Sequence, residues 1–524
     1  MTGAIFPARL ADILGTLSLS TDLAAGVPME TSLRTCSMAA RIARCLGLDD
    51  VGAADAYYTA LLRHLGCTSF AHEAAGSAAG DDHDFLRTFE AVDPIDRFAI
   101  AKRMVSTLAR GKGAGARVGA FSRTLFNPAL APSLAEAQCA QASALAADLG
   151  MTARTVRALQ QIFERYDGTG VPCSLAGQEI ELSARILHVA TLAEIQYRHA
   201  GPEHALEVVR ARRGTQLDPS VVAVFVDQAE NLWPLLSGSA WEAFLDAEPG
   251  SPRAIDASER DTLALTFARY ADLKIPSRLG HSPAVADLAC RAGIDDALSA
   301  SEIETLRLAA LLHDIGVVGV PNGVWEKRQP LNAVDWERIR LHSYDTERIL
   351  VRVPALAGAA TVAGAHHERL DGSGYFRGST LAPAARTARI LACADAYVAM
   401  TADRPHRAAL SADAAADELR REVAVGRLCG RATDAVLAAA TGKRRSEKPP
   451  AVELTAREID VLVAVARGGT NKEIAEALGI AVRTAKHHLE NIYAKVGVST
   501  RSGAALFAVR RGLVNLDQDG PSDP

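Results

Sequence analysis

Apolar residues recur along most of this chain at the three- and four-residue spacing of amphipathic helices, and Ala and Leu dominate these runs. This periodicity predicts a mostly α-helical protein with few strands. The chain has 524 residues, which is more than one hydrophobic core usually supports. Its length therefore predicts roughly two to four domains.

The pattern of the first half recurs at low similarity in the second half. The matched segments are 34–48 with 280–294, 56–67 with 307–317, and 161–187 with 366–391. Such self-similarity indicates that one helical unit occurs twice. We therefore expect two helical domains of related fold in tandem.

Breaks in the pattern predict the domain boundaries. Pro and Gly residues within 237–256 indicate a boundary near residue 250, and the polar stretch 441–450 ends in two prolines, as expected of a linker. The predicted fold class is all-α. The expected units are a first helical domain at 1–249, a second at 250–442, a linker at 443–450, a small C-terminal four-helix domain at 451–516 and a disordered tail at 517–524.

Composition narrows the cellular setting. The chain is 48% hydrophobic with 5% aromatic residues, and its eight cysteines form no C-x-x-C pair. Several of them lie inside apolar helical patterns and are typical of buried thiols in a reducing cytoplasm. No window of about 18 uninterrupted apolar residues occurs, which predicts a cytoplasmic protein without a membrane anchor.

Charge is distributed unevenly around a net value of −5. Residues 443–516 carry 13 Lys or Arg against 7 Asp or Glu, whereas residues 1–442 carry 44 against 52. The C-terminal end is therefore the candidate for nucleic-acid binding. A solvated basic helix face would produce the same excess of positive charge. The charge count alone therefore does not distinguish a DNA-binding region from an ordinary exposed helix, and the motif in that region is needed.

The second copy of the repeat contains a group of histidines and aspartates within short apolar runs. An unpaired imidazole or carboxylate in such surroundings loses hydration without compensation, and a shared cation is the simplest compensation. We therefore predict one metal site. Its candidate ligands are His281, His313, Asp314, His342, His366, His367 and Asp395.

The first copy lacks this group. The segment matches pair Thr35 with His281, Arg63 and His64 with His313 and Asp314, Ile162 and Phe163 with His366 and His367, and Thr191 with Asp395. Side chains of these types do not form a site for a hard divalent ion. The first copy is therefore interpreted as a scaffold, a dimerisation surface or a sensor.

Residues from about 260 to 440 resemble the HD superfamily of metal-dependent phosphohydrolases. The residues that carry the resemblance are the His-Asp pair at 313 and 314, the flanking ligands and the segment HHERLDGSGYF at 366–376, which is similar to the HD-GYP subgroup. This resemblance implies hydrolysis of a cyclic dinucleotide at a centre of two divalent transition-metal ions, Fe or Mn.

Carried onto this sequence, the resemblance implies that His281, His313, Asp314 and Asp395 bind one metal. Asp314 would also bridge to a second metal bound by the other three histidines, and would thereby take part in catalysis. Imidazoles favour Fe, Mn or Zn over Mg, and two metals roughly 3.5–4 Å apart can acidify a shared water.

Arg404, Arg407 and Lys327 are the candidate phosphate contacts, because guanidinium groups match phosphate oxygens in bidentate fashion. A solvated surface lysine is an equally good interpretation of Lys327. The sequence departs from the subgroup at three positions. Val317 stands where Lys is usual, Phe376 replaces the Pro of Gly-Tyr-Pro, and Ser277 stands where some relatives have a Glu that binds a third metal, so we predict two metals.

The C-terminal region has the signals of a helix-turn-helix. Thr455 with Glu458 and Thr470 with Glu473 each fit the S/T-x-x-E capping box. Apolar residues on either side of Gly479 are spaced so that two helices pack across a turn. Residues 452–515 resemble the LuxR type of DNA-binding domain, which implies promoter DNA as a partner.

By that resemblance, the helix from about 482 to 495 enters the major groove. Lys486 and His487 would face base edges, and Arg483, Thr484 and Lys472 would contact phosphates. His488 is expected to pack within the module. A homodimer is the expected assembly.

Three functions remain open from the sequence. The chain is a regulator that hydrolyses a cyclic dinucleotide and binds promoters, or a transcription factor whose metal domain senses a nucleotide or metal without turnover, or a phosphohydrolase for another phosphate ester. The direction of transcriptional control and the signal read by the first half are not predicted.

Overall fold

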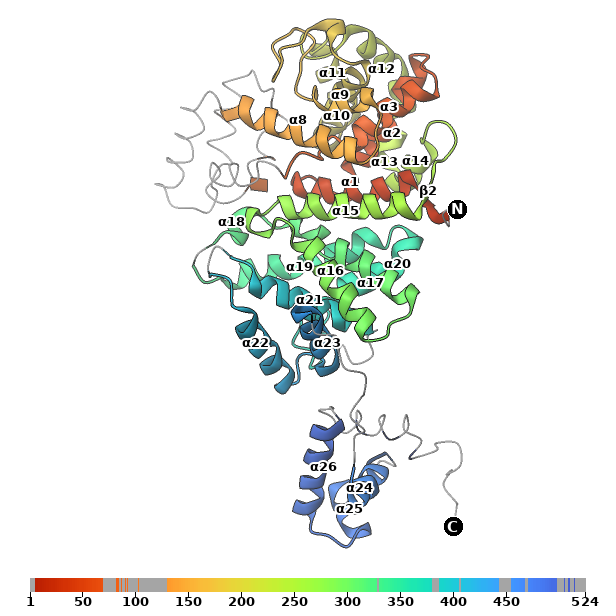
Figure 1. Cartoon of the computed structure of the whole chain (residues 1–524). Helices are drawn as coiled ribbons and strands as arrows, with labels where there is room; N and C mark the ends of the chain where they lie inside the picture. Colours follow the sequence, from red (N-terminus) through yellow and green to blue (C-terminus); the bar gives the residue numbers. More distant parts are fainter. Residues whose placement is uncertain are drawn as a thin grey trace, which may run out of the picture.

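The computed structural model shows a helical protein (Figure 1), which confirms the predicted all-α class. The structure describes residues 5–68, 82, 83, 86, 90, 92, 102, 130–327, 329–378, 386–404, 407–442, 454–466, 470–496, 504, 508 and 513. The expected linker at 443–450, the expected tail at 517–524 and most of the fourth C-terminal helix lie outside these residues. Among the described residues the one sheet pairs two short antiparallel strands, β1 (Ile5–Arg9) and β2 (Ala254–Asp256).

The described part of the first half consists of helices. They are α1 (Leu10–Ala24), α2 (Thr31–Cys45), α3 (Asp50–Leu61), α8 (Leu130–Asp148), α9 (Ala153–Leu159), η1 (Gly177–Glu179), α10 (Leu182–Ala200), α11 (Pro202–Ala211), α12 (Pro219–Leu232), α13 (Pro234–Ser237) and α14 (Ala240–Asp246).

The second half is also helical. Its elements are α15 (Ala257–Leu273), η2 (Pro276–Arg278), α16 (His281–Asp295), α17 (Ala300–Leu312), η3 (Ile315–Gly319), α18 (Asn322–Trp325), α19 (Ala333–Leu350), η4 (Pro354–Leu356), α20 (Ala357–Gly364), α21 (Arg386–Thr401), α22 (Ala412–Ala424) and α23 (Gly430–Thr441).

Equivalent contacts in the two halves support the internal repeat. Asp22 accepts hydrogen bonds from the backbone amide and the hydroxyl of Ser32, at 3.1 and 2.6 Å. In the second half Asp272 accepts the same two bonds from Ser282, at 3.0 and 2.7 Å. Each pair ties the end of one helix to the start of the next, so the two halves share a contact that the apolar pattern does not encode.

The register of the first matched segment differs from the prediction by about one helical turn. Helix α2 begins at Thr31 and α16 begins at His281, and each follows a residue with left-handed backbone. Thr31 therefore occupies the place of His281, and the pairing of Thr35 with His281 was wrong. A shift of four residues leaves the apolar face of a helix almost unchanged, so the pattern could not fix the register.

A close backbone approach also occurs in both halves. A Cβ atom on Gly316 would lie 2.2 Å from the carbonyl oxygen of His342, and one on Gly66 would lie 2.0 Å from that of Gln138. Both positions require glycine because no side chain fits between the segments. The equivalence identifies Gln138 as the first-half counterpart of His342.

The two halves share one hydrophobic core. Helix α1 of the first half packs on η3 and α19 of the second. The Ser20 hydroxyl on α1 donates to the carbonyl oxygen of Ile315 at 2.9 Å. The first half therefore supports the turn that directly follows Asp314.

A buried ion pair also joins the halves. The Lys274 ammonium contacts the carboxylate of Asp82, and both side chains are 1% exposed or less. The backbone N–H of Asn322 donates to the second Asp82 oxygen at 2.8 Å. Burial alone would raise the pKa of Asp82, but Lys274, His83 and the Asn322 amide outweigh burial and hold that pKa below its ordinary value.

The C-terminal module has a core of its own, formed by α24 (Ala456–Ala466), α25 (Asn471–Ala477) and α26 (Val482–Val496). Both predicted capping boxes are present, since Thr455 and Glu458 exchange hydrogen bonds, as do Thr470 and Glu473. The predicted start of the last of these helices, at residue 482, is confirmed.

We predict that Lys274→Met lowers the free energy of unfolding by about 3–5 kcal/mol, because it leaves the buried Asp82 charge without its lysine counter-ion. Adding Asp82→Asn should recover most of that loss. Urea unfolding of the single and double variants measures both effects. Arg420→Met, at an exposed ion pair with Asp417, is the control and should cost less than about 1 kcal/mol. A double variant no more stable than the single one would contradict the prediction.

Candidate metal centre

Five helical elements bring the seven predicted ligands together. His281 is the first residue of α16, and Asp395 lies on α21. His313 and Asp314 follow α17, and His342 is in the middle of α19. The remaining two, His366 and His367, follow α20. Six of the seven are buried, and His367 is half-buried.

The first group of candidate ligands surrounds one oxygen of Asp395. Its Oδ1 atom lies 3.0 Å from Nε2 of His281 and 3.7 Å from Nε2 of His313. The Oδ2 atom of Asp314 lies 3.2 Å from the same His313 nitrogen and 3.7 Å from that of His281. Two imidazoles and two carboxylates thus converge at ligand-to-ligand distances.

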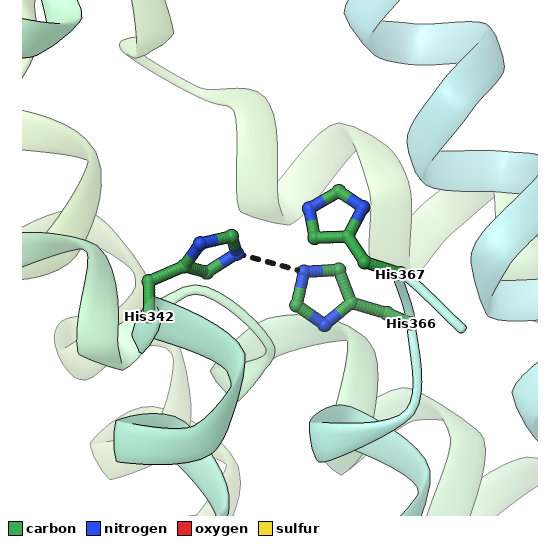
Figure 2. Close-up of side chains that lie close together, drawn as sticks. All are labelled: His342, His366 and His367. Atoms are coloured by element: carbon green, nitrogen blue, oxygen red, sulfur yellow. Dashed lines mark hydrogen bonds between the residues drawn. The ribbon is translucent and has the colours of Figure 1, made fainter. Parts of the chain in front are cut away.

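The second group consists of His342, His366 and His367 (Figure 2), whose ligand atoms all lie within 4.8 Å of one another. The other Asp314 oxygen, Oδ1, is 3.4 Å from Nε2 of His342 and 3.7 Å from Nε2 of His366. Asp314 therefore faces one group with each of its oxygens, which is the geometry of a bridging carboxylate.

Backbone carbonyls fix the tautomer of three of these histidines. Nδ1 of His313 lies 2.7 Å from the carbonyl oxygen of Ala310, and Nδ1 of His366 lies 2.6 Å from that of Ala363. Nδ1 of His342 lies 2.5 Å from the carbonyl oxygen of Ile339, three residues before it. A carbonyl can only accept, so each Nδ1 carries the proton and each neutral ring directs an Nε2 lone pair into the site.

This arrangement leaves lone pairs facing each other. Nε2 of His342 lies 3.2 Å from Nε2 of His366 (Figure 2), although neither atom carries a proton in the neutral ring. Among the described residues, Nε2 of His313 and Oδ1 of Asp314 have no hydrogen-bond partner. A cation compensates such a contact, because two ligands about 2.0–2.1 Å from one ion stand at this separation. The donor set therefore fits divalent metal ions.

Protonation states also suit metal binding. Burial lowers the pKa of all five histidines, that of His281 to about 3. Burial alone would raise the pKa of Asp395, but its contacts with His281 and His313 hold that pKa well below the ordinary value. Neutral imidazoles and ionised carboxylates are the forms that bind metals.

Arg278 is a residue that the sequence analysis missed. Its guanidinium pairs with Oδ2 of Asp314 and lies 5.9 Å from the ring centre of Trp325. Burial and the neighbouring Arg404 lower its pKa to about 10. Val317 stands where the subgroup usually has a lysine, so that positive charge is absent after the His-Asp pair. Arg278 brings a positive charge to the bridging carboxylate instead. Its position three residues before His281 was the available signal.

The three predicted phosphate contacts differ in their surroundings. Arg404 is half-buried. Burial lowers the pKa of its guanidinium, and the negative charge of Asp395 opposes this lowering. The charge of Arg404 therefore lies near the candidate ligands. The guanidinium of Arg407 donates to carbonyl oxygens at the end of α21, 2.7 and 2.9 Å away. Lys327 pairs with Asp335 in the first turn of α19. Of the three, Arg404 is the one whose charge interacts with a candidate ligand, Asp395.

The equivalent place in the first half holds a guanidinium. Nη1 of Arg63 donates to Oγ1 of Thr191 at 2.8 Å, and Arg63 is buried. Burial lowers the pKa of Arg63, and Glu194 opposes this. A fixed cation therefore occupies the region that corresponds to the metal ligands of the second half.

The predicted DNA contacts lie on the surface of α25 and α26. All five are exposed: Lys472, Arg483, Thr484, Lys486 and His487. Nζ of Lys486 lies 3.8 Å from Oε1 of Glu490, one turn further along the helix. His488 is half-buried.

Comparisons with known proteins agree with this architecture. Residues 266–428 match the family described as HD domain, and residues 452–508 match the bacterial regulatory proteins of the luxR family. The chain is 30% identical over 414 residues to 3'3'-cGAMP-specific phosphodiesterase 3 of Vibrio cholerae, covering 78% of this chain and 89% of that relative. Its C-terminal region is 48% identical over 66 residues to the transcriptional regulatory protein LiaR of Bacillus subtilis, covering 13% of this chain and 31% of LiaR.

A solved structure extends the comparison to the fold. The crystal structure of a cyclic GMP-AMP-specific phosphodiesterase from V. cholerae superposes with a TM-score of 0.57 at 26% identity, covering 83% of this chain and 98% of that one. Within the described residues, no helix is both long and apolar enough to cross a membrane.

The similarity to the V. cholerae phosphodiesterase and the two family matches identify the chain. It belongs to the HD-domain phosphodiesterases of the HD-GYP type and carries a LuxR-type helix-turn-helix domain at its C-terminal end.

Proposed function

We propose that this chain is a cytoplasmic transcriptional regulator whose second helical domain, at 250–442, hydrolyses a cyclic dinucleotide at a two-metal centre. The observation that carries the proposal is the position of Asp314, which presents one oxygen to each of two histidine groups. Relatives with cyclic-dinucleotide phosphodiesterase names support the substrate class. The domain at 1–249 acts as scaffold or sensor, and the module at 451–516 binds promoter DNA as part of a homodimer.

In this proposal the seven side chains hold two divalent transition-metal ions, Fe or Mn. His281, His313 and Asp395 bind the first, His342, His366 and His367 bind the second, and Asp314 bridges. Bound metals would acidify a shared water and neutralise phosphoryl oxygens. The carbonyl contacts of His313, His342 and His366 keep their Nε2 atoms unprotonated and oriented.

Arg404 and Arg278 supply the fixed positive charge near the reacting phosphate. Arg278 contacts the ligand carboxylate of Asp314, and the charge of Arg404 interacts with that of Asp395. Arg407 and Lys327 stay predictions as phosphate contacts, since their present partners lie within the protein. Guanidinium groups are suited to phosphate oxygens that gain charge during displacement.

A second candidate function is a sensor without turnover. The ion pair between Arg278 and Asp314 favours it, because a guanidinium on the bridging carboxylate competes with metal for the same oxygen. A nucleotide that binds two conformations unequally would then change promoter affinity without being consumed.

We predict that Asp314→Asn reduces the bound metal from about two ions per chain to one or fewer, because a neutral amide cannot bridge two cations. Elemental analysis of the purified protein by mass spectrometry measures this. Asp417→Asn, at an exposed residue of α22, is the control and should bind as much metal as the unchanged protein. Equal metal contents in all three preparations would refute the bridging role.

The metal-loaded protein should convert a cyclic dinucleotide into a linear product. His366→Ala should lower kcat/KM by about a hundredfold or more, since it removes a ligand of the second group. Product chromatography follows the reaction, and Asp417→Asn again serves as the control. An intact nucleotide that nevertheless shifts DNA affinity would select the sensor, whereas neither effect would dismiss both functions.

DNA binding can be tested independently of turnover. Arg483→Ala should weaken binding to all sequences and reduce the slope of log affinity against log salt by about 1, as expected of a phosphate contact. Lys486→Ala should instead reduce discrimination between operator and unrelated DNA, by about 1–3 kcal/mol. Fluorescence anisotropy at several salt concentrations separates the two roles. Arg420→Ala, outside the module, is the control, and identical behaviour of all three variants would refute the assignments.

A further inference from the structure

Helix α19 has an exposed apolar surface on the side opposite its buried face. His342, Ile349 and Leu350 lie on the buried face. Among the described residues, five exposed large apolar side chains lie on this one helix: Val334, Trp336, Leu341, Tyr344 and Val351. Single exposed apolar side chains are ordinary on a protein surface, whereas a contiguous group of them marks an interaction site.

Four of these side chains lie in one line along the helix. Together with the exposed Glu337 and Arg348 they form a set of six positions whose spacing alternates between three and four residues. We call this set the α19 stripe; its members are Val334, Glu337, Leu341, Tyr344, Arg348 and Val351. Alternating spacings of three and four residues are typical of a helix that packs along another helix.

The loop after His367 extends the apolar surface beyond the helix. The ring centre of Tyr344 lies 5.4 Å from that of Phe376, in an edge-on arrangement. Phe376 is half-buried, so part of its ring is accessible beside the stripe. A partner on the α19 stripe would therefore also contact this aromatic pair.

The α19 stripe is complementary to an antiparallel copy of itself. With a two-fold axis between residues 342 and 343, position 334 meets 351, position 337 meets 348, and position 341 meets 344. Val334 then packs on the partner's Val351, and Leu341 packs on the partner's Tyr344. Each contact occurs twice, because the same surface of both copies forms a two-fold interface.

The charges of the stripe select the antiparallel orientation. In the antiparallel pair Glu337 meets the partner's Arg348, which is an attractive contact. A parallel pair would place Glu337 against the partner's Glu337 and Arg348 against the partner's Arg348. Like charges at both positions would disfavour that arrangement.

The residues that flank the stripe fit the same register. Arg340 would lie beside the partner's Glu347, and Arg338 would lie beside the partner's Asp345. Both arginines are exposed, and both acidic residues are half-buried. Opposite charges therefore meet along both sides of the antiparallel pair as well as within it.

We propose that α19 forms a two-fold symmetric antiparallel helix pair with α19 of a second copy of this chain. The proposal rests on the proposed function only in taking a homodimer as the assembly, and it adds the surface, the orientation and the register. No residue of the stripe is a candidate metal ligand, so the interface is independent of turnover. The pair joins two helix-turn-helix modules in one assembly, as recognition of two half-sites requires.

A charge exchange provides the first test, with sedimentation velocity of the full-length protein at micromolar concentration as the measurement. We expect a dimer. Glu337→Arg and Arg348→Glu each place like charges opposite each other at two symmetric contacts, and each should raise the dimer Kd by about tenfold or more. The double variant restores opposite charges and should dimerise within about threefold of the unchanged protein.

An apolar substitution complements the charge exchange. Leu341→Glu, near the two-fold axis, should raise the dimer Kd by about a hundredfold or more. Val425→Glu replaces an exposed apolar residue outside α19 and is the matched control. A monomeric unchanged protein, a dimer that survives Leu341→Glu, or a double charge variant as weakly dimeric as the single ones would overturn the proposal.

Cross-linking tests the register. Val334→Cys protein is mixed with Val351→Cys protein and treated with a short bismaleimide, and the unchanged protein gives the background from the exposed Cys45 and Cys173. The mixture should form cross-linked dimers above this background. Val334→Cys protein alone should not, because the two 334 positions lie about 25 Å apart in the antiparallel pair. Equal cross-linking with and without mixing, or none in the mixture, would overturn the register.

Dimerisation and turnover fail separately. Loss of the dimer in the single charge variants and its return in the double variant, without hydrolysis of any cyclic dinucleotide, supports the interface and refutes the phosphodiesterase. A monomer that hydrolyses a cyclic dinucleotide supports the phosphodiesterase and refutes the interface.

Discussion

The second half of this protein is organised around a contact that is unfavourable without a cation. Nε2 atoms of His342 and His366 face each other at 3.2 Å while both rings donate their only proton to backbone carbonyls. Burial keeps these rings neutral, so they cannot avoid the contact by protonation at neutral pH. The apolar packing that surrounds them therefore has to hold a geometry whose compensation comes from a bound ion.

The backbone near Asp314 shows how the fold maintains that geometry. Gly316 lets the turn after Asp314 approach the carbonyl oxygen of His342, and any side chain there would separate α17 from α19. On the opposite side the same turn is held by the Ser20 hydroxyl from the first half. The first half thus contributes to the position of the bridging carboxylate without supplying a candidate ligand, which gives it a physical connection to the site.

The seven candidate ligands could be predicted because buried imidazoles and carboxylates are rare enough to stand out from an apolar helical pattern. Arg278 was missed although it lies three residues before His281, because an arginine between a proline and a glycine is typical of an exposed turn and its contact with Asp314 depends on tertiary structure. The predicted register of the first matched segment was wrong for another reason. Thr31 and Thr35 lie on the same helix face, and the Asp22 to Ser32 contact that distinguishes them is made across a turn.

The two halves compensate buried ionisable groups in different ways. In the first half the charges of Glu194 and Asp22 favour the charged form of the buried Arg63, a cation that is part of the chain. The second half has ionisable ligands, and Arg278 pairs with Asp314 among them. A covalently attached charge stabilises a fold permanently, whereas a bound ion can be exchanged and can polarise water. The loss of ligands in one half and their retention in the other thus separates a structural role from a chemical one.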